Sequence, residues 1–115
     1  MVTIGRARSD AVFRAIADPT RRRILGILRT RQHTVGELAL NFQTSRPAIS
    51  KHLRQLRGAG LVTTTRHGNF NVCQLNAEPL IAVNTWLQDY QALWEANLQG
   101  LKRFVESGRG KKAKR

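Results

Sequence analysis

The stretch Thr44–Leu56, TSRPAISKHLRQL, combines a helix start signal with a one-sided apolar pattern. Ser45 (or Thr44) is a typical N-cap, and Pro47 falls in the first turn, where a missing N–H group costs little. Three aliphatic residues recur at helical spacing: Ile49, Leu53 and Leu56. The pattern predicts a helix over residues 45–57 that buries one narrow edge against a core.

The side of this helix away from the apolar edge is polar and basic, and the stretch contains no acid. That side carries Arg46 at its margin, then Pro47, Ser50, Lys51 and Arg54. Hydroxyl, amine and guanidinium groups on a short helix suit a DNA major groove. The alternative is an ordinary amphipathic surface helix, and the flanking sequence decides between the two interpretations.

The segment just before this helix predicts another short helix. Thr34-Val-Gly-Glu37 fits a capping box ahead of Leu38–Leu40, and Asn41–Gln43 interrupts the helical pattern. Gly58 and Gly60 end the following helix in the usual C-terminal way. Two short helices joined by a tight turn, the second with a basic outer face, predict a helix-turn-helix.

Beyond Gly60 the apolar pattern changes from helical to alternating. LVTTTR (61–66) and FNVCQL (70–75) flank a turn that contains Gly68, which predicts a β-hairpin wing over 61–75. Arg66, His67 and Asn69 are expected at its tip, where an arginine can reach phosphates or the minor groove. The alternative is a polar turn that contacts nothing.

Two helices are predicted before the helix-turn-helix. Residues 1–8 are expected to form a flexible arm, and Ser9 is expected to cap a helix over 9–17. Asp18 and Pro19 then start a second helix. Its first turn contains Arg21–Arg23, at the wrong end for the helix dipole, so these side chains either pair with acids or meet phosphates.

The last predicted helix, over 77–106 with Asn76 as its cap, contains both tryptophans and the only tyrosine. One small domain can scarcely cover so much aromatic surface, and an uncovered patch of that kind indicates an interface. We expect a homodimer formed by 9–17 and 77–106, whereas packing inside the monomer is the alternative. The expected interface residues are Val12, Phe13, Ile16, Val83, Trp86, Leu87, Tyr90, Trp94, Leu98, Leu101 and Phe104.

The formal net charge of +13 is unevenly distributed. Residues 1–75 hold thirteen Lys and Arg against three acids, whereas residues 76–106 hold two against four. Residues 107–115 add five bases and are expected to form a disordered tail. The basic half predicts a polyanionic partner, with double-stranded DNA favoured over a membrane surface because no long helix combines a basic face with a broad apolar one.

The composition also restricts the class of protein. Cys73 is the only cysteine, so neither an internal disulfide nor a cysteine metal knuckle is expected. No run approaches the roughly 20 apolar residues of a membrane span, so we expect no membrane association and a soluble, cytoplasmic (nucleoid-associated) bacterial or archaeal protein. No nucleophile–base arrangement, phosphate loop or paired carboxylates are present, which argues against an enzyme and a cofactor.

The chain resembles the ArsR/SmtB family of winged-helix bacterial repressors over roughly residues 9–106. The matching stretches are FRAIADPTRRRILGIL (13–28), TVGELA (34–39), SRPAISKHLRQLRGAGLV (45–62) and LNAEPL (75–80). The metal-independent SdpR-like branch is the most similar in its Trp-rich last helix. The expected fold is therefore mainly α with a small β-hairpin wing, in the order three helices, recognition helix, two strands and a long helix.

The resemblance implies a homodimeric repressor that binds a palindromic operator. Carried over to this sequence, the groove contacts are Arg46, Pro47, Ser50 and Lys51, with Ser45 and Arg54 at phosphates and Thr44 beside them. Arg46 or Arg54 is the expected reader of guanine, because a planar guanidinium can bond O6 and N7 together. A largely nonspecific architectural DNA-binding protein is the alternative, and no residue pattern identifies a small-molecule effector.

The chain departs from the metal-sensing members of this family. Residues 37–41 read ELALN with no thiol, and the last helix has Asp89 but no histidine. His33, His52 and His67 fall on separate elements, so no metal site is expected, and His52 is expected at the groove edge or in packing. Cys73 alternates with Leu75 and is expected to be a buried apolar residue rather than a redox switch.

Overall fold

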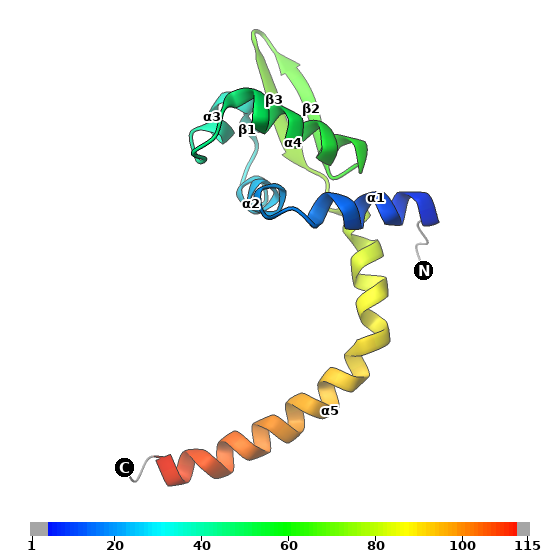
Figure 1. Cartoon of the computed structure of the whole chain (residues 1–115), viewed down its shortest axis with the longest axis vertical. Coiled ribbons are helices and arrows are strands. Elements are labelled where there is room, and N and C mark those ends of the chain that lie inside the picture. Colours follow the sequence, from blue (N-terminus) through cyan, green and yellow to red (C-terminus); the bar gives the residue numbers. More distant parts are fainter. Residues whose placement is uncertain (1–4, 113–115) are drawn as a thin grey trace. The chain divides into compact units, whose positions relative to one another are not determined.

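The computed structural model describes the backbone of residues 5–112 and the side chains of residues 5–107. Its elements are α1 (Arg6–Ile16), α2 (Pro19–Leu28), β1 (His33–Thr34), α3 (Val35–Ala39), α4 (Arg46–Gly58), β2 (Val62–His67), β3 (Phe70–Leu75), the short 3-10 helix η1 (Glu78–Leu80) and α5 (Ile81–Lys112) (Figure 1). The chain divides into two compact units, Met1–Val83 and Asn84–Arg115. The first unit contains the helix-turn-helix and the hairpin.

Side-chain caps start the three helices α2, α3 and α4 as the sequence predicts. Asp18 accepts from the Arg21 backbone N–H at 3.0 Å, and Ser45 accepts from that of Ala48 at 3.2 Å. Thr34 and Glu37 form the reciprocal capping box, with distances of 2.8 and 3.1 Å. Each cap accepts a hydrogen bond from a backbone N–H group of the first turn that has no acceptor within the helix. The cap therefore fixes the residue at which the helix begins.

The helix α4 ends in a Schellman motif at Gly60. The Gly60 N–H donates to the Arg57 carbonyl at 2.9 Å, and the Leu61 N–H donates to the Leu56 carbonyl at 3.0 Å. Gly60 has φ +78°, a left-handed conformation that side chains other than glycine resist. The motif turns the chain sharply from α4 into the hairpin and buries Leu61.

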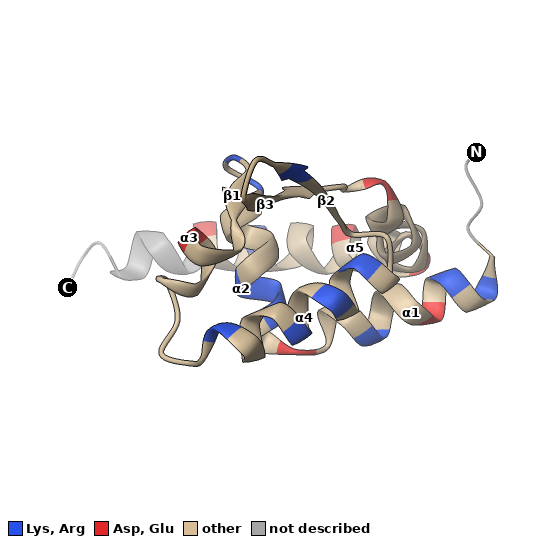
Figure 2. Ribbon diagram, turned by 90° about the horizontal axis from the view of Figure 1, so that it is seen from above, with Lys and Arg blue, Asp and Glu red and all other residues tan. Residues whose placement is uncertain are grey.

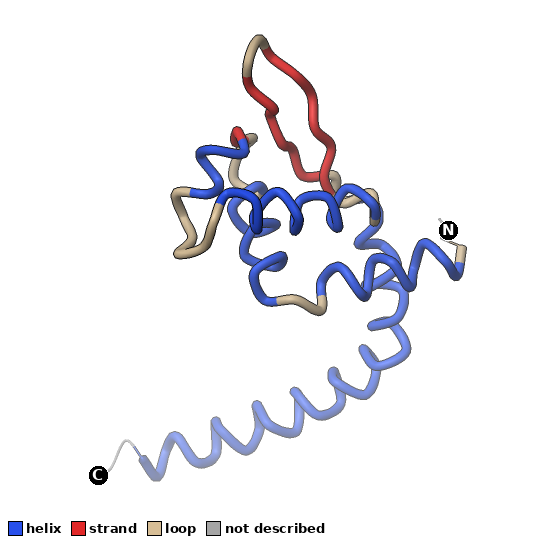
Figure 3. Tube along the Cα trace, turned by 45° about the horizontal axis from the view of Figure 1, so that its top comes forward, coloured by secondary structure: helices blue, strands red, loops and turns tan. Residues whose placement is uncertain are grey.

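The hairpin is one part of a three-stranded antiparallel sheet in the order β1-β3-β2. The register pairs Val62 with Leu75 and His67 with Phe70, so Gly68 and Asn69 form a two-residue turn. Gly68 has φ +61° and Asn69 does not have a positive φ, as in a type II′ turn. The hairpin projects away from the helices of its unit (Figure 3).

The sequence did not predict β1, which consists of His33 and Thr34 alone. Two residues are too short for an alternating pattern, and the strand exists because it pairs with the remote Cys73 and Val72 of β3. This pairing joins the start of the helix-turn-helix to the base of the wing.

The apolar stripes of α1, α2, α3 and α4 and the base of the hairpin form one core. Its fully buried aliphatic side chains are Val12, Ile24, Leu38, Ile49, Leu53, Leu56 and Leu61. The three buried residues of α4 are those that the sequence predicts. Burying an aliphatic side chain contributes about 1.5–3 kcal/mol, so this core anchors α4 firmly.

Several predicted boundaries differ from the structure. α1 begins at Arg6 instead of Ser9, because Gly5 precedes it and residues 6–8 continue the helix without a side-chain cap. Asn76 precedes η1 and donates to the Gly60 carbonyl instead of capping α5 directly. α5 continues to Lys112 instead of ending near Glu106. The rest of the predicted arm (1–4) and tail (113–115) lies outside the described residues.

Candidate DNA-binding surface

The polar side of α4 is open to solvent. Ile49, Leu53 and Leu56 hold the opposite side in the core, so the expected contact residues point outward. Ser50 is half-buried, and the exposed members of the set are Thr44, Ser45, Arg46, Pro47, Lys51 and Arg54. Lys and Arg gather on α4 and on the neighbouring α1 (Figure 2).

Arg46 lies against α3. A Cβ atom built on Gly36 would be 3.9 Å from Cζ, Nη1 and Nη2 of Arg46, which is ordinary van der Waals contact. The guanidinium therefore lies next to Gly36 of α3, where the backbone has no side chain. Its polar edge makes no hydrogen bond or ion pair to the other described side chains, so it is available to a partner.

The tip of the wing exposes Arg66, His67 and Asn69, as the sequence predicts. Arg66 Nε donates to the Gly68 carbonyl at 3.2 Å, so its guanidinium folds over its own turn. Phe70 is also exposed beside the turn, at 62% of its surface. The alternating pattern of 70–75 did not single it out as a surface residue.

His52 faces the start of α2 instead of the outer side of α4. Its Nδ1 atom lies 3.4 Å from Arg21 Nη1 and 3.9 Å from Asp18 Oδ2, and its side chain is 26% exposed. The hydrogen bond from the Arg21 backbone N–H group lowers the pKa of the Asp18 carboxyl, and the nearby His52 and Arg21 side chains act in the same direction. His52 is thus a packing residue between α4 and α2.

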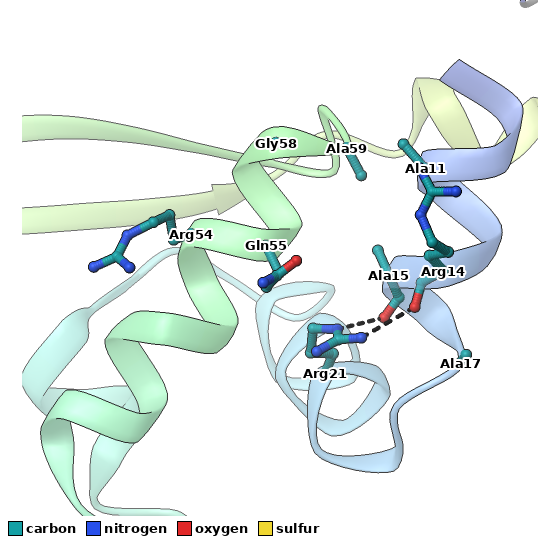
Figure 4. Close-up of a pocket in the computed structure, with 9 residues that line it drawn as sticks. All are labelled: Ala11, Arg14, Ala15, Ala17, Arg21, Arg54, Gln55, Gly58 and Ala59. Carbon is teal, nitrogen blue, oxygen red and sulfur yellow. Dashed lines mark hydrogen bonds between the residues drawn. The ribbon is translucent and has the colours of Figure 1, made fainter. Parts of the chain in front are cut away.

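The three arginines at the start of α2 bind backbone carbonyl groups. Arg21 donates to Ala15 at 2.7 Å and to Arg14 at 3.0 Å (Figure 4), and Arg22 donates to Ile16 at 2.8 Å. These carbonyl groups belong to the last turn of α1, where the helix itself supplies no hydrogen-bond donor for them. These arginines are therefore paired within the chain, through carbonyl oxygens instead of the acids that one of the two alternatives named.

Arg23 is held by the turn of the helix-turn-helix. Its Nη2 donates to the Asn41 carbonyl at 3.1 Å, and its Cζ lies 4.5 Å from the centre of the Phe42 ring. A cation over an aromatic face adds to the hydrogen bond. Arg23 therefore fixes the turn that precedes α4.

The expected dimer residues fall into three groups by burial. Val12 is fully buried in the core of its own unit and Val83 packs against that core, so Val12 has no surface for a partner and its assignment is wrong. Phe13, Ile16 and Leu87 are half-buried. The exposed members all lie on α5: Trp86, Tyr90, Trp94, Leu98, Leu101 and Phe104.

The thiol and the possible metal ligands form no site within the described part of the chain. Cys73 is fully buried, and burial raises the pKa of its thiol. No cluster of three His, Cys, Asp or Glu residues that could hold a metal occurs within residues 5–107. Across the described helices, none has the length and apolar character needed to cross a membrane.

A capped helix-turn-helix, an exposed basic face on α4 and a hairpin behind it define a winged helix-turn-helix protein. A family model described as "Bacterial regulatory protein, arsR family" matches residues 18–64. The transcriptional repressor SdpR of Bacillus subtilis is 39% identical over 79 residues, which are 69% of this chain and 88% of SdpR. An HTH-type transcriptional regulator of Mycobacterium tuberculosis is 38% identical over 98 residues, which are 85% of this chain and 89% of that protein.

A solved structure supports the same assignment. The crystal structure of an ArsR family transcriptional regulator is 37% identical, covers 82% of this chain and 97% of its own, and superposes with a TM-score of 0.72. The chain belongs to the ArsR family of bacterial regulatory proteins. It is a DNA-binding transcriptional regulator, and the members found here are regulators and repressors, not enzymes.

Proposed function

We propose that the protein is a homodimeric repressor that binds a palindromic operator, reads it through α4 and needs no metal ion. The observation that carries the proposal is the apolar surface of α5. In the single chain, eight large apolar side chains of this helix are at least 40% exposed: Trp86, Tyr90, Leu93, Trp94, Leu98, Leu101, Phe104 and Val105. Such a patch is too apolar to remain in water, and a second copy of α5 matches its length and chemistry.

A two-fold symmetric dimer has a geometry that suits binding to an operator. It would set two copies of α4 in successive major grooves about 34 Å apart, so the operator would be palindromic. Within each half-site, Arg46, Lys51 and Arg54 provide the exposed cations. In this proposal the protein acts in the cytoplasm, at the nucleoid. Contacts to phosphates supply affinity, and contacts to bases supply sequence specificity.

The proposal is tested by selecting bound fragments from random DNA and sizing the complexes by sedimentation. A palindromic consensus bound by two copies supports it. A specificity ratio of about 10³ or more over scrambled duplex at physiological salt is expected. A ratio near one would instead favour the nonspecific architectural protein, which the high charge of +13 also allows.

Arg46 and Arg66 have different expected roles, which two substitutions separate. Arg46→Ala should relax the preference at one operator position, by about 1–3 kcal/mol, because a bidentate contact to guanine is lost. Arg66→Ala should weaken selected and scrambled duplexes alike, because a wing arginine contacts the backbone. Base reading by Arg46 is wrong if both variants lose affinity for the two duplexes equally.

A further inference from the structure

An arginine-lined groove runs between α1 and the C-terminal half of α4. One cavity of about 560 Å³ and a second of about 290 Å³ are neighbours, because both are lined by Ala11, Gly58 and Ala59. The arginines that line them are Arg8, Arg14, Arg21, Arg54 and Arg57, and neither cavity has an acidic lining residue. All of these residues belong to the unit Met1–Val83.

The floor of the groove is made of residues with small side chains. α1 contributes Ala7, Ala11 and Ala15, which recur every four residues on one face, and α4 contributes Gly58 and Ala59. A small side chain at each point leaves the two helix backbones accessible. A ligand can therefore approach the two helix backbones between the arginines that line the groove.

Most of the arginines in the groove are free to bind. Arg21 is the exception, because it is bound to the Ala15 and Arg14 carbonyls (Figure 4). Arg14, Arg54 and Arg57 are exposed, and their guanidinium groups make no hydrogen bond or ion pair among the described side chains. Arg8 lies at the far end, where a Cβ on Gly60 would be 3.7 Å from its Nη2.

We infer that this groove binds the sugar-phosphate backbone of the DNA beside the segment read by α4. Arg54 belongs both to the expected DNA contacts of α4 and to the groove, so the two surfaces are continuous. Arg8 and Arg14 are six residues apart, about 9 Å along the axis of α1, and each DNA strand carries one phosphate per about 3.4 Å of the DNA axis, so this span covers more than one phosphate. An extended polyanion therefore matches the groove better than one small anion does.

The composition of the groove also argues against a small organic ligand. Sites for such ligands are mostly apolar and aromatic with a few polar groups, whereas no aromatic side chain lines this groove. At 100° per residue, Phe13 lies on roughly the opposite side of α1 from the groove residue Ala11. α1 can therefore contact DNA on one side and a second copy on the other.

This inference rests on the proposed function, and the experiment separates the two. The variants are Arg14→Gln and Arg57→Gln, with Arg29→Gln as the matched control, since Arg29 is an exposed arginine of the same unit outside the groove. Affinity for the selected duplex and for a scrambled duplex of equal length is measured across a salt series. Thermal unfolding checks that every variant is folded.

Each groove variant should lower the slope of log affinity against log salt by about one, because one phosphate contact is lost. Both duplexes should weaken by the same factor, and the control should keep the wild-type slope. Arg14→Lys and Arg57→Lys should retain the slope, because they keep the charge.

The inference is overturned if the groove variants have the slope of Arg29→Gln. It is also overturned, in favour of a small-anion site, if inorganic phosphate binds the wild type and not the groove variants while their DNA binding matches the control. If the wild type itself prefers no sequence, the proposed repressor fails, and the slopes on scrambled duplex still decide the groove.

Discussion

The helices α4 and α5 are both amphipathic, but α4 exposes its polar side and α5 exposes its apolar side. α4 buries all three residues of its apolar stripe in its own unit and turns polar and basic groups to solvent. α5 exposes its aromatic and aliphatic residues, including Trp86 at 50% and Phe104 at 73%. The packing of α4 is therefore complete within one chain, whereas α5 has an exposed apolar surface that the proposed dimer would cover.

This difference separates two requirements that a repressor has to meet. A reading surface has to be rigid before DNA arrives, because a helix that orders on binding loses affinity to that ordering. An assembly surface can remain incomplete in the single chain, because association supplies the missing burial. The following predictions test this division, starting from the largest expected effect.

Leu53→Ala should reduce the free energy of unfolding of the helix-turn-helix unit by about 2–5 kcal/mol, because Leu53 is fully buried and its truncation leaves a cavity. Urea denaturation at fixed protein concentration measures the loss. The neighbouring Arg54→Ala is the control and should change stability by less than about 0.5 kcal/mol. Equal losses from the two substitutions would contradict the packing of α4 described above.

Trp94→Ala should weaken self-association instead of the fold of the first unit. A central interface tryptophan contributes about 2 kcal/mol, and both copies in the dimer lose it, so the dissociation constant of the dimer should rise roughly a thousandfold. Sedimentation over a concentration series measures it. Gln99→Ala, which changes the opposite side of α5, should leave association unchanged, and a wild-type chain that stays monomeric would disprove the proposed dimer.

Asp18→Ala should destabilise the protein by about 1 kcal/mol at neutral pH, through loss of the cap of α2. The backbone hydrogen bond from Arg21 lowers the pKa of Asp18 in the folded state, so the carboxylate stabilises the fold above its ordinary value of 3.8. This contribution is lost as the pH falls below that value. Thermal unfolding of the variant and the wild type should therefore converge in acid, while Asp18→Asn should show a smaller loss that changes less with pH.

The sequence predicted the parts of the fold that depend on local signals. The caps at Asp18, Thr34 and Ser45 and the buried stripe of α4 are confirmed. Each of these features is set by residues within a few positions of one another, so one stretch of sequence contains the necessary information. The winged helix-turn-helix followed from the order of these local elements.

The sequence could not predict features that depend on remote partners. β1 exists only because His33 and Thr34 meet Cys73 and Val72. Arg22 donates to carbonyl groups at the end of α1, and the pattern of charged residues in the sequence does not indicate this interaction. The groove could not be predicted for the same reason, since Arg14 and Arg57 line neighbouring cavities only when α1 and α4 pack together.

The contact between Arg46 and Gly36 has an evolutionary consequence. A methyl group on Gly36 would just touch the guanidinium, and a larger side chain there would push it into a different orientation. Position 36 belongs to α3, outside the expected base-contacting set. Under the proposed base reading by Arg46, paralogues can diverge in operator preference through position 36 while every proposed contact side chain stays the same.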